Sequence, residues 1–461
     1  MRTIVISLLA LVWFSGCTMI PDYQRPAAPV PENLPSGGEV GSGRAAAELP
    51  WREFIQDAEL RQLIELSLEN NRDLRLAALQ VEQVRALYKI QREELYPSIY
   101  GGGGGSRSSA SRDLIGPNQD RITEVYQANL SLLSWEIDFF GRLRSLSEKA
   151  LQEFFATEQA QHAAQILLVS SVANGYLALA AERESLKLAE DTFKSQQEAY
   201  ELVERQYKQG LITELDLRRA QIPREVARGD IARYRQRVSN AENALQLLVG
   251  SALPTELLPT SLTDVTLPAT FASGLSSQVL LQRPDILAAE YQLCAAYATI
   301  GAARAAFFPN ITLIGSLGTA STELHRLFES GTGTWSFSPQ LSMPIFDARV
   351  WSAYRVSKVQ REIVLTQYEK AIQNAFRETA DALALCANIG EQLDAQKDLV
   401  EATEETYRLA RIRYEQGIDN YLSVLDAQRS MFSAQQALVS LKMAEHSSRL
   451  QLYAVLGGGA Q

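Results

Sequence analysis

Two series of apolar positions in this chain recur at alternating spacings of three and four residues, the heptad pattern of coiled-coil seams. The series are Ile231, Tyr234, Val238, Ala241, Leu245 and Leu248, and then Ile372, Phe376, Thr379, Leu383, Cys386, Gly390 and Leu393. The first series lies in a returning helix and the second in a long helix. Two long helices are predicted, over 141–209 and 349–416, because no proline interrupts either stretch. Each would be on the order of 100 Å long at 1.5 Å per residue. Many alanines lie off the seams, so such helices could pack on both flanks and build a closed tube. A plain antiparallel pair would need only one seam.

A period of two replaces the helical pattern in four short segments, near 98–109, 122–137, 310–321 and 333–346. In the fourth, Trp335, Phe337, Leu341, Met343 and Ile345 share one face, and Ser336, Ser338, Gln340 and Ser342 share the other. One apolar and one polar face suits a barrel wall between lipid and a wet lumen, with a soluble sandwich as the alternative. The glycine run 101–105 lacks the Gly-Lys-Ser/Thr of a phosphate loop, and it is predicted to be a strand that allows close backbone approach.

The chain is also a tandem repeat. Asp73 and Asp285 each begin a helical run that reaches a proline 24 residues later. Further matches share an offset of 207: Tyr207/Tyr414, Gly210/Gly417, Leu215/Leu422, Ala220/Ala427, Gln221/Gln428 and Gly250/Gly457. The predicted organisation is a first repeat over 59–250, with a helical hairpin over 141–249, and a second over 274–457, with a hairpin over 349–456. A Pro- and Thr-rich linker, 251–273, joins them, and 458–461 is a tail.

The N-terminus has the layout of a secretory signal. Arg2 precedes an apolar stretch that is too short to span a bilayer, and the small residues Ser15-Gly16 lead to Cys17. This arrangement resembles a bacterial lipobox, with a signal peptide over 1–16 and Cys17 as the lipid-bearing first residue of an extended segment, 17–58. Phe14 replaces the usual leucine, and a signal cleaved nearby that leaves an ordinary thiol is the alternative. Thr18, rather than Asp, favours the outer membrane.

The composition and the missing motifs mainly exclude classes of function. The formal net charge is −10 with no basic block, so no nucleic-acid partner is expected. Hydrolase motifs are absent, so no catalytic residue, cofactor or enzyme activity is expected. The widely spaced His162, His325 and His446 form no metal-ligand cluster. Cys294 and Cys386 are expected to be small buried residues, with a disulfide as the alternative. Beyond the signal, no membrane-spanning helix is expected.

Four strands cannot enclose a lumen, and open strand edges are not tolerated in lipid. If the strands enter a membrane, several copies of the chain must therefore pool them. Three copies would give twelve strands, although the sequence alone does not fix the number.

Motifs along nearly the whole mature chain resemble TolC-type outer-membrane efflux channels, in the lipid-anchored OprM-like (NodT-type) branch. They are Pro21–Pro26 after Cys17, Trp51–Phe54, Asn71–Leu74, Ser134–Arg142, Arg283–Ile286, Phe307–Pro309, Pro344–Asp347 and Tyr421–Arg429. The family's two glycines after Phe346-Asp347 are replaced by Ala348-Arg349, which leaves the local turn open.

The resemblance implies a mainly helical chain with a membrane β-barrel. A homotrimer would share a 12-stranded outer-membrane barrel, continuous with an α-helical coiled-coil tube in the periplasm. It further implies a passive channel for drugs or other small toxic compounds, working with a periplasmic adaptor (membrane fusion) protein and an inner-membrane pump of RND type. Cys17 would carry N-acyl and S-diacylglycerol groups. Alternatives are a duct for type I protein secretion or metal efflux, and, in a different class, a non-channel coiled-coil periplasmic lipoprotein.

Leu422, Asp426 and Arg429 lie at i, i+4 and i+7, on one helix face just after the turn at Gly417. By resemblance these three residues form the closed periplasmic aperture, with rings of Asp–Arg pairs and a leucine plug. The alternative is an ordinary exposed helical pair. The matching first-repeat residues, Leu215, Arg219 and Ile222, lack the Asp–Arg pair.

The two hairpin turns are predicted to dock the adaptor, although a helical hairpin needs such a turn in any case. Their residues are Gly210, Leu211, Ile212, Thr213, Gly417, Ile418, Asp419 and Asn420.

Overall fold

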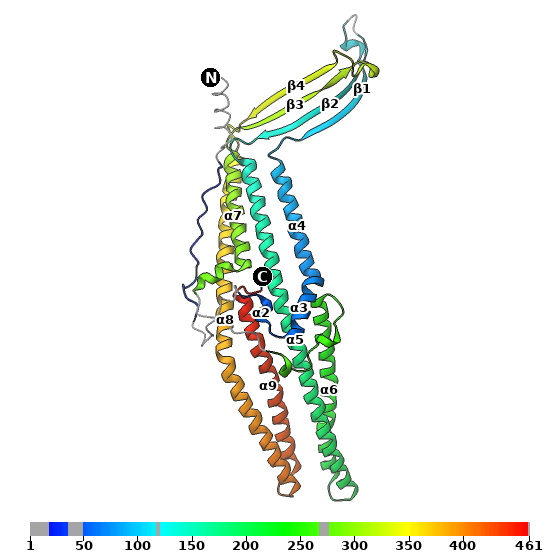
Figure 1. The fold of residues 1–461 in the computed structure, drawn as a ribbon, viewed down its shortest axis with the longest axis vertical. Coiled ribbons are helices and arrows are strands. Elements are labelled where there is room, and N and C mark those ends of the chain that lie inside the picture. Colours follow the sequence, from blue (N-terminus) through cyan, green and yellow to red (C-terminus); the bar gives the residue numbers. More distant parts are fainter. Residues whose placement is uncertain (1–17, 36–48, 117–119, 267–275, 460–461) are drawn as a thin grey trace. The chain divides into compact units, whose positions relative to one another are not determined.

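The computed structural model describes residues 18–35, 49–116, 120–266 and 276–459. The chain consists of two compact units. Figure 1 shows the helices and strands that they contain. Unit 1 is Met1–Ala27, Gln80–Glu158 and Ala288–Tyr368, and unit 2 is Ala28–Leu79, Gln159–Leu287 and Glu369–Gln461. Both repeats contribute to both units, so the structural division does not follow the sequence division.

Unit 1 contains one antiparallel sheet in the order β1-β2-β3-β4. The strands are β1 (Ile99–Ser109), β2 (Ile122–Ile137), β3 (Asn310–Ser321) and β4 (Gly333–Ser342). Strands β2 and β3 come from different repeats and pair directly, with Leu130 opposite Leu317 and an irregularity between Leu132 and Trp135. Strands β1 and β4 are the outer strands, and each has a strand partner on one side only within the described chain.

Strand β4 is shorter than the sequence pattern predicts. It ends at Ser342, so Met343 and Ile345, which the alternation assigned to its apolar face, lie beyond it. Pro344 offers no backbone N–H for a ladder at this point, and the next helix begins at Ala348. The prediction of a strand to residue 346 was therefore wrong.

The helices of unit 1 form a layer in the order α4-α5-α7-α8. They are α4 (Arg72–Glu93), α5 (Arg142–Lys208), α7 (Pro284–Ala305) and α8 (Ala348–Glu415), all of which continue into or begin in unit 2. Contacts between neighbours fix the order: Arg85 over Phe154, Phe155 with Tyr291, and Phe307 with Trp351. The two long helices lie within one residue of their predicted bounds. The layer therefore begins with α4, next to β1 in the chain, and ends with α8, next to β4.

Unit 2 holds the larger core. It adds α2 (Trp51–Phe54), α3 (Ala58–Asn70), α6 (Glu214–Val249) and α9 (Tyr421–Val455), and three short 3-10 turns, η3 (Thr255–Leu257), η4 (Leu262–Asp264) and η5 (Ser277–Gln282). Helix α2, which lies inside the segment predicted to be extended, buries Trp51 and Phe54, and the Phe54 ring stacks on Tyr453 at 3.9 Å.

The first part of the predicted linker is packed against α5. The Arg183 guanidinium donates to the carbonyl of Pro259 at 2.7 Å, and the Glu184 carboxylate accepts from the Leu262 amide at 3.1 Å. The Leu262 side chain is buried. Residues 251–266 thus form part of the unit 2 core, whereas 267–273 lie outside the described residues.

Helix α5 contains a window long and apolar enough to cross a membrane by length and composition, and half of that window is buried. This window differs from the prediction of no membrane-spanning helix beyond the signal. Buried residues of α5 such as Val172, Ala173 and Leu179 belong to the unit 2 core, so core packing accounts for this apolar composition.

Candidate channel wall, tips and gate

The sheet has one apolar and one polar face, as directly paired residues show. Leu130, Leu317 and Trp335 form a row across β2, β3 and β4, and the next row is Ser131, Ser316 and Ser336. The Oγ atoms of Ser316 and Ser336 lie 2.8 Å apart. Large apolar side chains exposed on the first face are Leu130, Leu317, Trp335, Phe337 and Leu341. A sheet with apolar side chains open on one face and serines on the other is typical of a membrane barrel wall.

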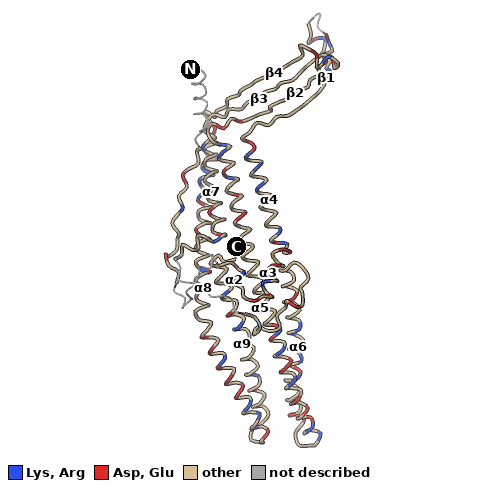
Figure 2. Tube along the Cα trace, in the orientation of Figure 1, with Lys and Arg blue, Asp and Glu red and all other residues tan. Residues whose placement is uncertain are grey.

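Charged residues are scarce in this wall. Strands β3 and β4 contain none, and Figure 2 shows the charged positions gathered mainly along the helices and near the strand ends. The glycine run lies inside β1, as predicted, and alternate glycines face the apolar side. A Cβ atom added to Gly105 would lie 2.9 Å from Cδ1 of Tyr126, so the tyrosine ring covers this glycine. The close neighbour at Gly105 is thus a side chain, and the nearest backbone atom along the run, Gln127 O at Gly103, is at an ordinary 3.5 Å, so the predicted close backbone approach is not what the run provides.

The two predicted tips are tight turns with the same hydrogen bonds. Gly210 (φ 75°) donates to the Tyr207 carbonyl at 2.8 Å, and Gly417 (φ 70°) donates to the Tyr414 carbonyl at 2.9 Å. The next amide in each turn reaches back five residues, from Leu211 at 3.0 Å and from Ile418 at 2.9 Å. This is the Schellman ending, in which glycine adopts the left-handed conformation that other residues avoid.

Each tip passes directly into a capped helix. The Thr213 hydroxyl accepts from the Asp216 amide at the start of α6, with Ile212 just before it, and the Asn420 side chain accepts from the Ser423 amide at the start of α9. The Leu211 and Ile418 side chains are exposed. Asp419 accepts two hydrogen bonds from Arg413, at 2.6 and 3.0 Å, and this guanidinium lowers the pKa of the Asp419 carboxyl. The tips are therefore rigid turns that present two apolar side chains.

The predicted gate residues share one exposed face at the beginning of α9. Arg429 Nη2 lies 3.1 Å from Asp426 Oδ1, and both side chains are more than half exposed. Leu422 is 45% exposed. Both members of this pair belong to α9 and remain exposed in the single chain. They can therefore face a lumen or another chain.

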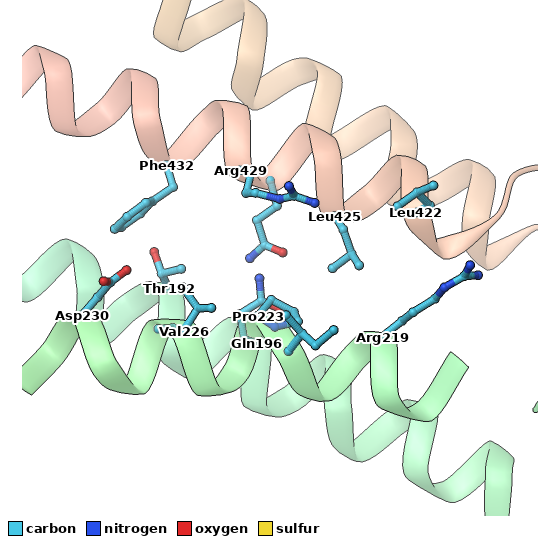
Figure 3. A pocket seen from close by; sticks show the side chains of 13 residues that line it. Thr192, Gln196, Arg219, Pro223, Val226, Asp230, Leu422, Leu425, Arg429 and Phe432 are labelled. Atoms are coloured by element: carbon cyan, nitrogen blue, oxygen red, sulfur yellow. The ribbon is translucent and has the colours of Figure 1, made fainter. Parts of the chain in front are cut away.

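A groove in unit 2 brings the two repeats together at this level. It has a volume of about 340 Å³ and is lined by Leu422 and Arg429 of α9 and by Arg219 and Ile222 of α6. Arg219 and Ile222 are the first-repeat counterparts of Asp426 and Arg429. Figure 3 shows Arg219, Pro223, Val226 and Asp230 on one helix opposite Leu422, Leu425, Arg429 and Phe432 on the other. Sequence reasoning missed this groove because three separate helices build it.

Sequence reasoning also missed a polar clamp on the N-terminal segment. Cys17 itself lies outside the described residues. Shortly after it, Arg25 donates two hydrogen bonds to the Glu290 carboxylate, at 2.8 and 2.7 Å, and the Tyr23 hydroxyl donates a third at 2.9 Å. The Glu290 side chain is 10% exposed, so the clamp ties the segment to α7 within unit 1.

Comparison with known proteins decides the family. A family model described as "Outer membrane efflux protein" matches residues 63–251 and 275–458. The chain belongs to this family. It is 44% identical over 449 residues to a toluene efflux pump outer membrane protein, TtgC, of Pseudomonas putida, covering 96% of this chain and 93% of that protein. It is 42% identical over 454 residues to the cation efflux system protein CusC of Escherichia coli, covering 97% and 96%.

A solved structure agrees. The open state of the MtrE outer membrane channel of Neisseria gonorrhoeae superposes with a TM-score of 0.87 at 37% identity, covering 96% of this chain and 99% of that one. The efflux-channel fold, the outer-membrane location and the function as an outer-membrane efflux channel follow for this chain. The family and these relatives are channels rather than enzymes.

Proposed function

We propose that three copies of this chain form the outer-membrane duct of a tripartite pump that conducts small toxic organic compounds passively to the exterior. The observation that carries the proposal is the two-faced sheet with outer strands β1 and β4 open for further pairing. In lipid both edges must find partners, and pairing β1 of one copy with β4 of the next satisfies them. Three four-stranded sheets would then close a twelve-stranded barrel.

The helical layer supports the same assembly. Its two outermost members carry exposed apolar residues in unit 1: Leu87 and Ile90 on α4, and Val356, Val359 and Ile363 on α8. Two different apolar stripes at opposite ends of a layer suit a head-to-tail contact between copies, and such contacts close into rings. The proposed seam of helices continues the proposed seam of strands.

The proposed partners are a periplasmic adaptor at the tips and an inner-membrane pump of RND type. The turns 210–213 and 417–420 would offer Leu211 and Ile418 to the adaptor. The Leu422, Asp426 and Arg429 face would form the closed aperture. Cys17 would carry the N-acyl and S-diacylglycerol groups that anchor the chain.

An organic cargo is favoured over a metal ion. The relatives include one named for toluene efflux and one named for cation efflux. Among the described residues, no group of three or more His, Cys, Asp or Glu side chains is arranged to hold a metal ion. A duct for type I secretion would share the barrel, and a non-channel lipoprotein would have no use for the two-faced sheet.

The test is the mass of the detergent-extracted protein by light scattering, with the detergent contribution subtracted, followed by recordings in planar bilayers. We expect the mass of three chains and discrete conductance steps. Val359→Glu on the exposed stripe of α8 should reduce the mass to one chain, whereas Gln360→Glu beside it should not. A wild-type protein that stays monomeric and silent in bilayers would refute the shared barrel.

A further inference from the structure

The groove between α6 and α9 has the size and lining of a small-molecule site. Its volume of about 340 Å³ falls at the lower end of the roughly 300–1,000 Å³ common for ligand pockets. Apolar side chains from both helices form its walls (Figure 3): Ile222, Pro223, Val226, Leu422, Leu425 and Phe432. Such a space suits a compound with one or two rings.

A buried acceptor without a partner points to the polar group of that compound. Gln196 of α5 lines the groove and is 4% exposed. Within the described parts of the chain, its Oε1 atom has no hydrogen-bond partner. A buried acceptor left unpaired is unfavourable, so a ligand with a hydroxyl donor would gain a hydrogen bond there that the protein does not make for itself.

The charges around the groove are already paired, which argues against a charged ligand. Arg219 lies 3.8 Å from Asp216, and Arg429 lies 3.1 Å from Asp426. Asp230, the acidic side chain of the lining, pairs with Arg233 at 2.8 Å. What remains for a ligand is apolar surface, the unpaired acceptor of Gln196, the amide of Gln428, which also lines the groove, and two guanidinium groups that attract the face of an aromatic ring.

A proline on α6 lines the groove, and the matching position on α9 is not a proline. Pro223 has no backbone N–H, so α6 lacks the helical hydrogen bond to the carbonyl of Arg219, and the proline ring lines the groove. The matching residue on α9 is Ser430, whose hydroxyl donates to the Asp426 carbonyl at 2.9 Å. Across the groove, α6 with its missing hydrogen bond at Pro223 faces α9, which has no proline at the matching position.

We propose that this groove binds a small neutral phenol, with the ring between Pro223, Val226 and Phe432 and the hydroxyl donating to Gln196 Oε1. Leu422 and Arg429 line the groove and also belong to the proposed gate. If that gate is correct, a bound phenol would contact two of its three residues. Binding itself does not depend on the gate and is measured without transport.

The test is a titration of the purified full chain in lipid nanodiscs, followed by fluorine NMR. The probes are 4-fluorophenol and fluorobenzene, which lacks the hydroxyl, and empty nanodiscs give the partition into lipid. We expect saturable binding of 4-fluorophenol above that background. Gln196→Leu should weaken its affinity by about three- to tenfold, the usual effect of one hydrogen bond, and leave fluorobenzene unchanged.

Two further variants make the result decisive. Val226→Trp fills the groove from an exposed position and should abolish binding of both probes. Gln197→Leu is the matched control, since Gln197 is bonded to Glu201 and does not line the groove. The proposal is overturned if the wild-type signal equals that of empty nanodiscs, or if Gln196→Leu and Val226→Trp bind 4-fluorophenol like the wild type. A protein that conducts ions but fails this titration would lose the phenol site and keep the proposed function.

Discussion

Arg283 Nη1 donates a hydrogen bond of 2.8 Å to the backbone carbonyl of Val455. The first repeat contains the same link, since Asn71 Nδ2 donates to the carbonyl of Leu248 at 2.8 Å. Asn71 and Arg283 each stand two residues before the matched aspartates, and Leu248 and Val455 each stand two before the matched glycines. In both repeats one side chain thus joins the start of the first helix to the end of the returning helix.

Replacement of Arg283 should destabilise unit 2. Its guanidinium also binds Asp285 at 2.7 Å and Glu378 at 3.1 Å, and burial leaves its side chain only 10% exposed. Arg283→Met would leave Asp285 without its ion-pair partner and Glu378 with only Arg377, at 4.0 Å, and partial exposure of both carboxylates limits the expected loss to about 2 kcal/mol. Thermal unfolding of the assembled protein measures it. Arg408→Met, which breaks an exposed ion pair with Glu405, is the control and should change little.

The two matched glycines should respond differently to alanine. Both have positive φ, 75° at Gly250 and 83° at Gly457, and this left-handed conformation costs alanine roughly 1–2 kcal/mol. A Cβ atom at Gly250 would also lie 2.5 Å from the carbonyl oxygen of Asn70, whereas at Gly457 the nearest atom is 3.6 Å away. We expect Gly250→Ala to lower the unfolding temperature clearly more than Gly457→Ala. Equal shifts would contradict the close approach.

Loss of the Asp426–Arg429 pair should open the proposed aperture. Asp426→Ala with Arg429→Ala removes the charges that would link copies across a narrow mouth, so single-channel conductance should rise in planar bilayers. Arg411→Ala with Glu415→Ala removes a similar pair, 2.9 Å apart, away from the gate face and is the control. If the gate variant and the control conduct alike, these residues are an ordinary surface pair.

A charge reversal at the second tip tests adaptor docking. Asp419→Lys changes the tip's charge and breaks the ion pair with Arg413, whereas Arg413→Gln breaks the same pair without reversing the charge of Asp419. We expect site-specific cross-linking to the adaptor and drug resistance in cells to fall in Asp419→Lys and to persist in Arg413→Gln. Full resistance in Asp419→Lys would exclude docking through this residue.

Acidification should destabilise unit 2 through His446. Burial lowers the pKa of this imidazole below its ordinary value, because it disfavours the charged form, and Nδ1 has no partner among the described residues. The unfolded chain then binds more protons, so stability is complete above about pH 6.5 and falls as the pH drops from there toward the folded-state pKa. Of the neighbouring charges, Glu445 opposes the shift and Arg449 adds to it. Comparing the unfolding temperature at pH 7.5 and 5 should give a smaller difference in His446→Gln than in the wild type.

The sequence predicted those parts of the fold that depend on local pattern. Heptad spacing and uninterrupted runs located α5 and α8 to within a residue, and alternation located β1 to β3. The end of β4 was missed because Met343 and Ile345 continue the alternation past the last ladder residue, and periodicity alone does not register the missing N–H of Pro344.

Contacts between distant segments were not predictable in the same way. Arg283 and Glu378 are 95 residues apart, and Glu290 is 265 residues from Arg25. Each of these residues looks like an ordinary charged helical position in the sequence. The groove at Gln196 needs three helices to be assembled before its unpaired acceptor exists, so a glutamine in a long helical stretch gives no sign of it.

The clamp on Glu290 also limits the distance between α7 and a lipid on Cys17. Ile20 packs so tightly on α7 that a Cβ atom at Gly301 would lie 2.6 Å from its Cγ1, and the Arg304 guanidinium donates to the carbonyl of Met19 at 3.3 Å. Ile20 follows Cys17 by three positions, which at full extension is about 10 Å of chain. With so short a connection, a lipid on Cys17 would set the distance of α7 from the inner leaflet, in addition to holding the protein at the membrane.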